Sequence, residues 1–241
     1  MTRASALVAA SHGTSSAEGG AAVAALVHAV RRAAPQLVVE DAFVDVQHPD
    51  VASVLDRLGE AHAAVVVPLL LSAGYHVHVD LAREVANAAG APALGAALGP
   101  DDRLVDVLAE RLAESGLRGD DRVVLAAAGS SDVRAVDDCR VVSRRLAARL
   151  GRPVAVGFLS AARPALADAI ARTRATHPVS RVVVSSYLLA PGYFHDLAVA
   201  AGGDVTTAPV LRADAPPPAS LVGLVLDRYA EAEALALSRA A

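Results

Sequence analysis

Two histidines at matching places in the sequence are the residues best suited to chemistry. His12 and His76 each come shortly after an apolar run, at residues 7–10 and 65–71. Such runs predict buried strands, and in open α/β sheets ligands bind beyond the carboxyl ends of the strands. Imidazole is the commonest metal ligand and also a proton acceptor near neutral pH. The pair therefore predicts a site for metal chemistry, for proton transfer, or for both.

A carboxylate at the end of another predicted strand extends this pair. Asp45 ends a strand expected near residues 37–45 and becomes a neighbour of both histidines if the strand order is two-one-three. Two histidines and one carboxylate suit a first-row divalent ion with positions left open. Two alternatives stay open: Asp45 can be a helix cap near Pro49, and His78 can be either an additional ligand or a solvated side chain.

The elements that must position these residues alternate along the chain, which implies a parallel sheet with right-handed crossovers. In the first half, strands are expected near residues 5–10, 37–45, 65–71 and 93–97, and helices near 18–33, 50–61, 79–89 and 101–115.

The second half of the chain repeats the first. The matched anchors are Gly13 with Gly129, Phe43 with Phe158, Val65–Val67 with Val182–Val184, Gly74 with Gly192, and Leu104–Arg111 with Leu221–Arg228, at offsets of 115 to 118 residues. We infer an α/β fold with two tandem, similar domains, each a small parallel sheet flanked by helices. The domains are expected at residues 1–117 and 118–241, and the join lies in a polar, glycine-containing stretch.

The two copies differ where chemistry is expected. His12 falls on Ala128, Asp45 on Ser160, and His76 on Phe194, with His195 one step later. The first domain therefore carries the metal and catalytic residues, and the second is a degenerate repeat. We expect a single site in the inter-domain cleft.

Composition excludes several classes of protein. The chain has 241 residues, a net charge of −4, one cysteine and no lysine. The charge offers no electrostatic footprint for nucleic acid, and the missing lysine excludes a Walker A loop and Schiff-base catalysis. Cys139 alone makes no intrachain disulfide, which fits a cytoplasmic protein. The longest apolar run, residues 63–71, is too short to span a bilayer.

A glycine-containing segment precedes the first predicted helix. Residues 13–16 (GTSS) can offer backbone N–H groups to an anion, or they can be an ordinary helix cap supplied by Ser15 or Ser16. We favour the cap. No dinucleotide fingerprint and no G-x-S-x-G elbow occur, so neither a nucleotide cofactor nor a serine hydrolase is expected.

Three stretches, at residues 11–14 (SHGT), 43–49 (FVDVQHP) and 67–80 (VPLLLSAGYHVHVD), resemble the sirohydrochlorin chelatases. These are class II, ATP-independent tetrapyrrole metal chelatases, and the resemblance covers the whole chain in their two-domain form. The family inserts Fe(II), Co(II) or, in some members, Ni(II) into sirohydrochlorin. The resemblance implies that His12 and His76 bind metal and are catalytic. The family often has glutamate where this chain has the shorter Asp45, so direct and water-bridged roles for Asp45 both stay open.

Metal insertion needs a loosely held ion and acceptors for two pyrrole protons, which a histidine pair with a carboxylate can supply. The substrate is flat and rich in carboxylates, so arginines at the rim are expected, with Arg134 and Arg163 as candidates. The two loop tyrosines can pack against the macrocycle or can be core residues. The residues expected to contact substrate are Ser11, Gly13, Gly74, Tyr75, His78 and Tyr193.

The resemblance thus implies a lyase that inserts Fe2+ into sirohydrochlorin to give siroheme, with a divalent metal as substrate and no organic cofactor. A cobaltochelatase of cobalamin synthesis is the close alternative, and a non-enzymatic metal-binding protein or metallochaperone is the alternative from another class. A phosphatase-like enzyme using residues 11–13 lacks the arginine expected before the histidine. No nucleic-acid or membrane partner is expected, and the internal duplication favours a monomer.

Overall fold

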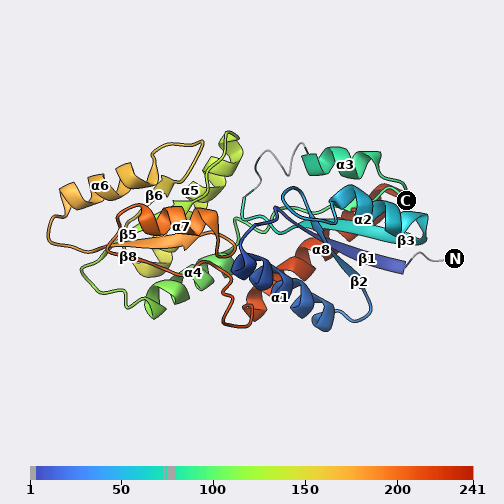
Figure 1. The fold of residues 1–241 in the computed structure, drawn as a ribbon, viewed down its shortest axis with the longest axis horizontal. Coiled ribbons are helices and arrows are strands. Elements are labelled where there is room, and N and C mark those ends of the chain that lie inside the picture. Colours follow the sequence, from blue (N-terminus) through green and yellow to red (C-terminus); the bar gives the residue numbers. More distant parts are fainter. Residues whose placement is uncertain (1–3, 73, 75–79, 241) are drawn as a thin grey trace. The chain divides into compact units, whose positions relative to one another are not determined.

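The computed structural model describes residues 4–72, 74 and 80–240. It contains two four-stranded parallel sheets with helices packed on them, so the predicted α/β fold with two similar parts is confirmed (Figure 1). In each sheet the strands, numbered along that half of the chain, lie in the order two-one-three-four, which is the arrangement that makes the strand before Asp45 a neighbour of the first strand. None of the described helices is long and apolar enough to cross a membrane.

The first sheet and its connecting elements are β1 (Ala4–Ser11), α1 (Ala17–Ala33), β2 (Val38–Phe43), α2 (Val51–Leu58), a 3-10 turn (Gly59–Ala61), β3 (His62–Pro68), α3 (Ala82–Asn87) and β4 (Ala93–Leu94). The second is built from β5 (Arg122–Ala127), α5 (Val133–Leu150), β6 (Val154–Phe158), α6 (Leu166–Thr176), β7 (Val182–Tyr187), α7 (Tyr193–Ala200) and β8 (Val205–Thr206). Two further helices are α4 (Asp102–Glu114) and α8 (Ala219–Ala240).

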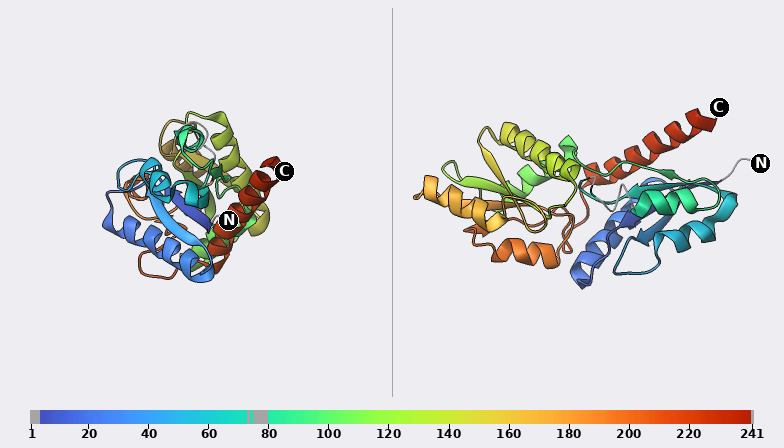
Figure 2. Two further views of the ribbon diagram at one scale, coloured as in Figure 1. Left: turned by 90° about the vertical axis from the view of Figure 1, so that its right-hand side faces the viewer. Right: turned by 90° about the horizontal axis from the view of Figure 1, so that it is seen from above.

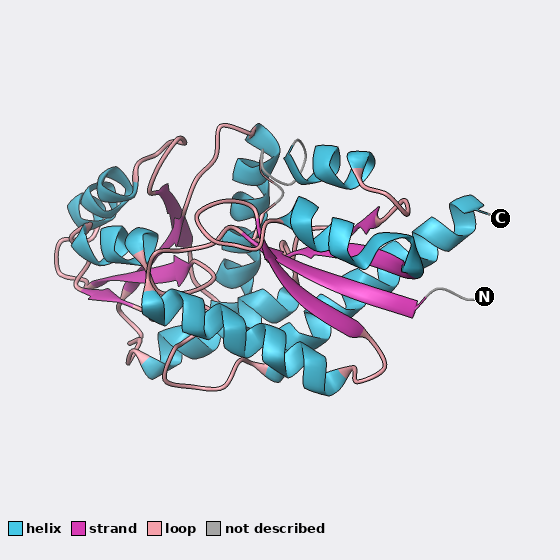
Figure 3. Cartoon of the chain, turned by 45° about the vertical axis from the view of Figure 1, so that its right-hand side comes forward, coloured by secondary structure: helices cyan, strands magenta, loops and turns pink. Residues whose placement is uncertain are grey.

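Helices lie on both faces of each sheet, as Figure 3 shows for the first. In the first sheet, α2 and α3 pack on one face through an apolar cluster that includes Val8, Val54 and Leu81. In the second sheet, α6 and α7 occupy the corresponding face through a cluster that includes Val124 and Ile170. The central strands β1 and β5 are buried on both faces, which explains why they are continuous apolar runs without polar alternation.

The compact units are not the two halves of the sequence. One unit comprises residues 1–98 and 216–241, and the other comprises residues 99–215, whereas the repeats give 1–117 and 118–241. The difference lies in the last helix of each repeat: α4 packs on α5 and β7 in the second unit, and α8 packs on α1, β3 and β4 in the first. Figure 2 shows α8 in red against the first unit.

One arginine on each of the helices α4 and α8 binds the helix to its unit. Arg111 of α4 donates from Nε to the carbonyl oxygen of Pro209 and from Nη2 to that of Val210, both at 3.2 Å. Arg228 of α8 makes the matching bonds to Ala97 and Leu98, at 3.0 and 3.3 Å. Each guanidinium also pairs with a glutamate three residues later on its own helix. The two arginines are the last residues of the repeat anchor, so the internal repeat extends to this contact.

Strand register corrects one of the sequence anchors. Leu7 pairs with Val65, and its equivalent Val123 pairs with Val183, so the third strands match at an offset of 118 residues. The sequence alignment placed Val65 on Val182, an offset of 117. The error arose because runs of valine match equally well in either register. The corrected offset agrees with the one that aligns Gly74 with Gly192.

Two predicted strands are longer than the observed ones. The strand expected to reach residue 45 ends at Phe43, and the strand expected at 93–97 comprises only Ala93–Leu94. After Phe43 the chain bends, with Val44 bonded to Ser11 at the end of β1 and Asp45 bonded to His12 just beyond it. The hydrophobic pattern of the sequence alone does not reveal at which residue strand pairing ends and a loop begins.

Two glycines with the same φ, only one of which is crowded, can test how closely the backbone after β5 approaches the loop after β6. Gly129 (φ +91°) has no room for a Cβ, which would overlap the carbonyl oxygen of Ser160, whereas Gly202 (φ +91°) has nothing within 4 Å. Gly202→Ala is expected to cost about 1 kcal/mol through its φ alone. Gly129→Ala is expected to cost about 1–2 kcal/mol more in urea denaturation, because the loop must also shift. Equal losses would contradict this packing.

Candidate metal-binding site

The carboxyl ends of the first three strands are level with one another. Ser11 at the end of β1 lies opposite Phe43 of β2, and the preceding Ala10 lies opposite Pro68 of β3. The segments that follow these residues therefore leave the sheet at one edge. Sequence reasoning predicted this arrangement for the loops that carry His12 and Asp45.

Two backbone hydrogen bonds join the segment after β2 to the end of β1 and to the residue that follows it. The N–H of Val44 donates to the carbonyl oxygen of Ser11 at 2.9 Å, and the N–H of Asp45 donates to that of His12 at 3.1 Å. Gly13 turns away with φ +88°, and a Cβ there would lie 2.5 Å from the carbonyl oxygen of Asp45. Only glycine fits this position without strain, because of the positive φ and the nearby carbonyl oxygen, whether or not the residue also contacts a substrate.

The side chains of His12 and Asp45 are both exposed at this edge. Asp45 Oδ1 accepts a hydrogen bond from the N–H of Val46 at 2.8 Å. The alternative that Asp45 caps a helix is wrong, because Asp50 caps α2 and accepts from the N–H of Ser53 at 2.7 Å. That hydrogen bond lowers the pKa of Asp50. Asp45 is thus left at the strand edge rather than at a helix end.

Three predicted site residues, Tyr75, His76 and His78, lie outside the described residues. Gly74 is described, and its N–H donates to the carbonyl oxygen of Ser72 at 3.0 Å. Within residues 4–72, 74 and 80–240, no group of three His, Cys, Asp or Glu residues is placed to hold a metal ion. The predicted set of ligands includes His76, which is not among those residues.

The segment after His12 forms a helix cap. Ser16 is the N-cap of α1, and its Oγ accepts from the N–H of Gly19 at 3.2 Å, which confirms the cap interpretation of this segment. Thr14 Oγ1 in turn accepts from the N–H of Ser16 at 3.1 Å. Ser11, expected to contact substrate, is 5% exposed at the end of β1.

Sequence reasoning missed one residue at this edge, Gln47. Its Oε1 accepts a hydrogen bond from the N–H of Thr14 at 2.8 Å, so its side chain links the loop after β2 to the loop after β1. The repeat contains a signal for it. The equivalent residue of the second copy is Ala162, so Gln47 differs between the copies in the same way as His12 and Asp45.

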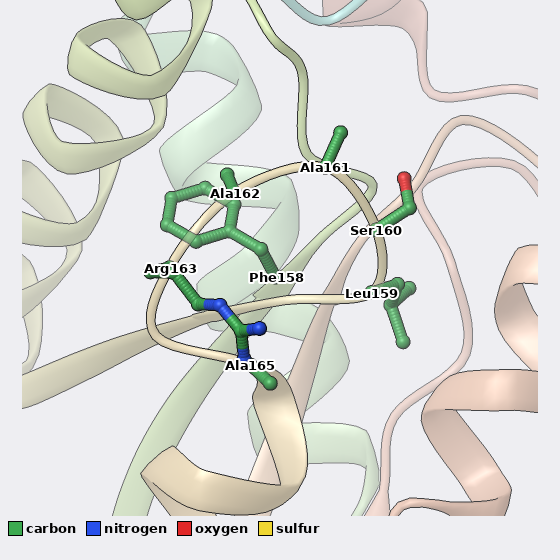
Figure 4. Close-up of a pocket in the computed structure, with 7 residues that line it drawn as sticks. All are labelled: Phe158, Leu159, Ser160, Ala161, Ala162, Arg163 and Ala165. Atoms are coloured by element: carbon green, nitrogen blue, oxygen red, sulfur yellow. The ribbon is translucent and has the colours of Figure 1, made fainter.

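The equivalent edge of the second unit keeps the loop but not the ligands. The loop of residues 158–165 lines a hollow of about 350 Å³, and Figure 4 shows Ser160 and Arg163 on this loop. The Arg163 side chain is 85% exposed and lies 3.9 Å from Asp168. The other candidate arginine, Arg134, is bound to the cap residue Asp132 at 2.8 Å.

The aromatic residues at the start of α7 are exposed. Tyr193 is 69% exposed and Phe194 39% exposed, with their rings edge to face at a centroid distance of 5.6 Å. The core interpretation of Tyr193 is therefore wrong. His195 is half-buried, and its Nε2 lies 3.1 Å from the carbonyl oxygen of Thr207. The register that aligns Gly74 with Gly192 places Phe194 opposite His76, as the sequence comparison did.

Three solved structures share this fold over most of the chain. SirB from Bacillus subtilis with Fe3+ matches with a TM-score of 0.76 and 20% identity, covering 97% of both chains. SirB from Bacillus subtilis subspecies spizizenii in complex with cobalt matches with a TM-score of 0.74 and 19% identity, covering 95% of both. CbiX, described as the terminal enzyme for siroheme biosynthesis in denitrifying bacteria, gives a TM-score of 0.63 and 22% identity over 92% of this chain and 98% of that one. The fold is thus that of the two-part chelatases.

The family model of CbiX matches residues 6–115 and 122–200. The chain belongs to the CbiX family. A curated relative, the sirohydrochlorin ferrochelatase of Priestia megaterium, is 27% identical over 191 residues, which cover 75% of this chain and 71% of that protein. The family assignment agrees with the resemblance that the three motif stretches indicated.

Proposed function

We propose that this chain is a sirohydrochlorin ferrochelatase, which inserts Fe2+ into sirohydrochlorin to give siroheme without ATP or an organic cofactor. The observation that carries the proposal is the joined pair of loops at the edge of the first sheet, with His12 and Asp45 exposed on them. The second copy of the same loops carries Ala128 and Ser160 instead. The Priestia megaterium relative supports the choice of substrate and of iron.

The reaction exchanges one divalent cation for two protons. Fe2+ forms bonds to the four pyrrole nitrogens, and two of these nitrogens release their protons. In this proposal His12 and His76 would hold the ion through neutral imidazoles, and each imidazole that has released the ion could then accept one of the departing protons. Asp45 either ligates the ion or holds a water bound to it. The ion must be held weakly enough to leave, which suits a set of few protein ligands with exchangeable water.

On the substrate side, the exposed Tyr193 and Phe194 offer an apolar surface to the flat macrocycle. Arg163 is the arginine that we propose for a substrate carboxylate, since it is more exposed and more weakly paired than Arg134. Ser11, Gly13, Gly74, Tyr75 and His78 remain the other proposed contacts. We further propose a cytoplasmic monomer, because the duplication supplies two similar units in one chain.

Cobalt is the second candidate metal. A chelatase of the same fold has been solved in complex with cobalt, and N/O ligand sets rank divalent ions in much the same order whatever the protein. The test is an absorbance assay with sirohydrochlorin and Fe2+ or Co2+ under anaerobic conditions. Faster insertion of Fe2+ supports the ferrochelatase, and faster insertion of Co2+ supports the cobaltochelatase. Metal binding without insertion would leave the non-enzymatic alternative.

The rate of insertion is expected to fall steeply below about pH 6. Metal-ligating imidazoles must be neutral, and an imidazole in water binds a proton near pH 6.5. Protonation therefore removes the ligands and the proton acceptors together. A rate–pH profile at saturating metal tests this for the parent and for Asp45→Asn. A parent rate that is flat from about pH 5 to 8 contradicts the histidine mechanism, and an unaffected Asp45→Asn removes Asp45 from the site.

A further inference from the structure

The loop after β2 and the equivalent loop after β6 can be compared, and the interactions that both make are the ones that the fold requires. In the first unit Asp45 N–H donates to His12 at 3.1 Å, and in the second Ser160 N–H donates to Ala128 at 2.9 Å. Val46 and its equivalent Ala161 have nearly the same positive φ, +57° and +52°. The backbone therefore closes the same way in both copies.

The turn that enters the following helix is duplicated as well. Thr14 Oγ1 accepts from the N–H of Ser16 at 3.1 Å, and Ser130 Oγ accepts from the N–H of Asp132 at 3.0 Å. In each copy the N–H donor is the N-cap residue of the helix, and the hydroxyl that accepts belongs to the residue two places before it. Loop, turn and cap are thus common to the copy with the proposed ligands and the copy without them.

The bond from Thr14 N–H to Gln47 Oε1 is specific to the first copy. The second copy has Ala162 in place of Gln47 and still forms the same loop. The glutamine bond is therefore not needed for the loop to fold. It occurs in the copy in which His12 and Asp45 stand where the other has Ala128 and Ser160.

The bond has a direct geometric consequence for the proposed site. Thr14 is two residues after His12, and Gln47 is two residues after Asp45. The backbone bond from Asp45 N–H already joins Asp45 to His12. The side-chain bond of Gln47 joins the same two segments again, two residues further along each of them. The bond from Val44 N–H to the carbonyl oxygen of Ser11 lies before this pair, and the bond from Thr14 to Gln47 lies after it. Bonds on both sides limit how far the His12 and Asp45 segments can move apart.

We propose that Gln47 is a positioning residue, which holds the His12 and Asp45 segments at the separation that divalent-metal binding and insertion require. This inference rests on the proposed function. Gln47 itself need touch neither the metal nor the tetrapyrrole. Residues that orient metal ligands typically change metal affinity or activity by roughly 10- to 100-fold when removed.

The test compares Gln47→Met and Gln47→Glu, which have side chains of similar length. Glutamate keeps an oxygen acceptor for Thr14 N–H, and methionine does not. Gln36→Ala, at the other, exposed glutamine of the chain, is the control. Three quantities are measured: the hydrogen-exchange rate of the Thr14 amide, the dissociation constant for Co2+ alone from its absorption spectrum, and kcat and KM for insertion.

Gln47→Met is expected to speed exchange at Thr14, to weaken Co2+ binding roughly tenfold, and to lower kcat with little change in the KM for sirohydrochlorin. Its urea midpoint should match the parent, since the second copy forms the loop without a glutamine. Gln47→Glu should restore slow exchange and most of kcat, and Gln36→Ala should match the parent throughout. Faster Thr14 exchange with unchanged Co2+ affinity and kcat overturns the proposal, and so does a Glu variant as impaired as Met. If the parent binds Co2+ but inserts no metal, the proposed function fails, while the Co2+ affinities still judge the role of Gln47.

Discussion

His12→Ala is expected to lower kcat/KM for metal insertion by about 10²–10⁴-fold, the contribution typical of a positioned acid–base group. The side chain is exposed at the end of β1, so its removal opens no core cavity, and the unfolding free energy should stay within about 1 kcal/mol of the parent. The measurement pairs an absorbance assay of sirohydrochlorin metallation with urea denaturation. The same outcome is expected for His76→Ala.

Two histidines serve as controls for this loss. His28 is exposed on α1, and His28→Ala should leave insertion unchanged. His195 lies against the carbonyl oxygen of Thr207, and the second unit has Ala128 at the position equivalent to His12. His195→Ala should therefore cost much less than His12→Ala. Comparable losses at His195 and His12 would mean that the second unit also contributes a ligand.

Arg111→Ala is expected to destabilise the protein by about 2–4 kcal/mol. The guanidinium is buried on α4 and donates to the carbonyl oxygens of Pro209 and Val210. Each buried acceptor left without its donor costs about 1–3 kcal/mol. Urea denaturation followed by far-UV circular dichroism measures the loss. Arg111→Lys should recover little of it, because one ammonium group does not reproduce the two divergent bonds of the guanidinium.

The matched control lies at the contact between α4 and α5. Arg149 Nε donates to Asp106 at 2.9 Å, but both side chains are more than half exposed. Exposed ion pairs contribute about 0–1 kcal/mol, so Arg149→Ala should cost less than about 1 kcal/mol. An Arg111→Ala variant as stable as Arg149→Ala would show that the carbonyl contacts do not hold α4 in the second unit.

Local patterns in the sequence were enough for the architecture of each sheet. Continuous apolar runs at β1 and β3 predicted buried parallel strands, because strands covered on both faces have no polar alternation. The repeat predicted two copies of one unit, and the motif stretches indicated the family. The loops of His12 and Asp45 could be placed at one edge because parallel strands end at the same side of their sheet.

Tertiary structure alone decided which helix completes which unit, and which side chains link the loops. The repeat assigns α4 to the first half and α8 to the second, but packing places α4 against β7 and α8 against β3. An amphipathic helix buries its apolar face equally well on either of two similar sheets, so its sequence pattern does not choose between them. The bond from Thr14 to Gln47 likewise joins residues 33 apart, whose meeting depends on the turn at Gly13. Sequence periodicity reports which face of an element is buried, whereas such contacts follow only from where folded elements end and how their loops close.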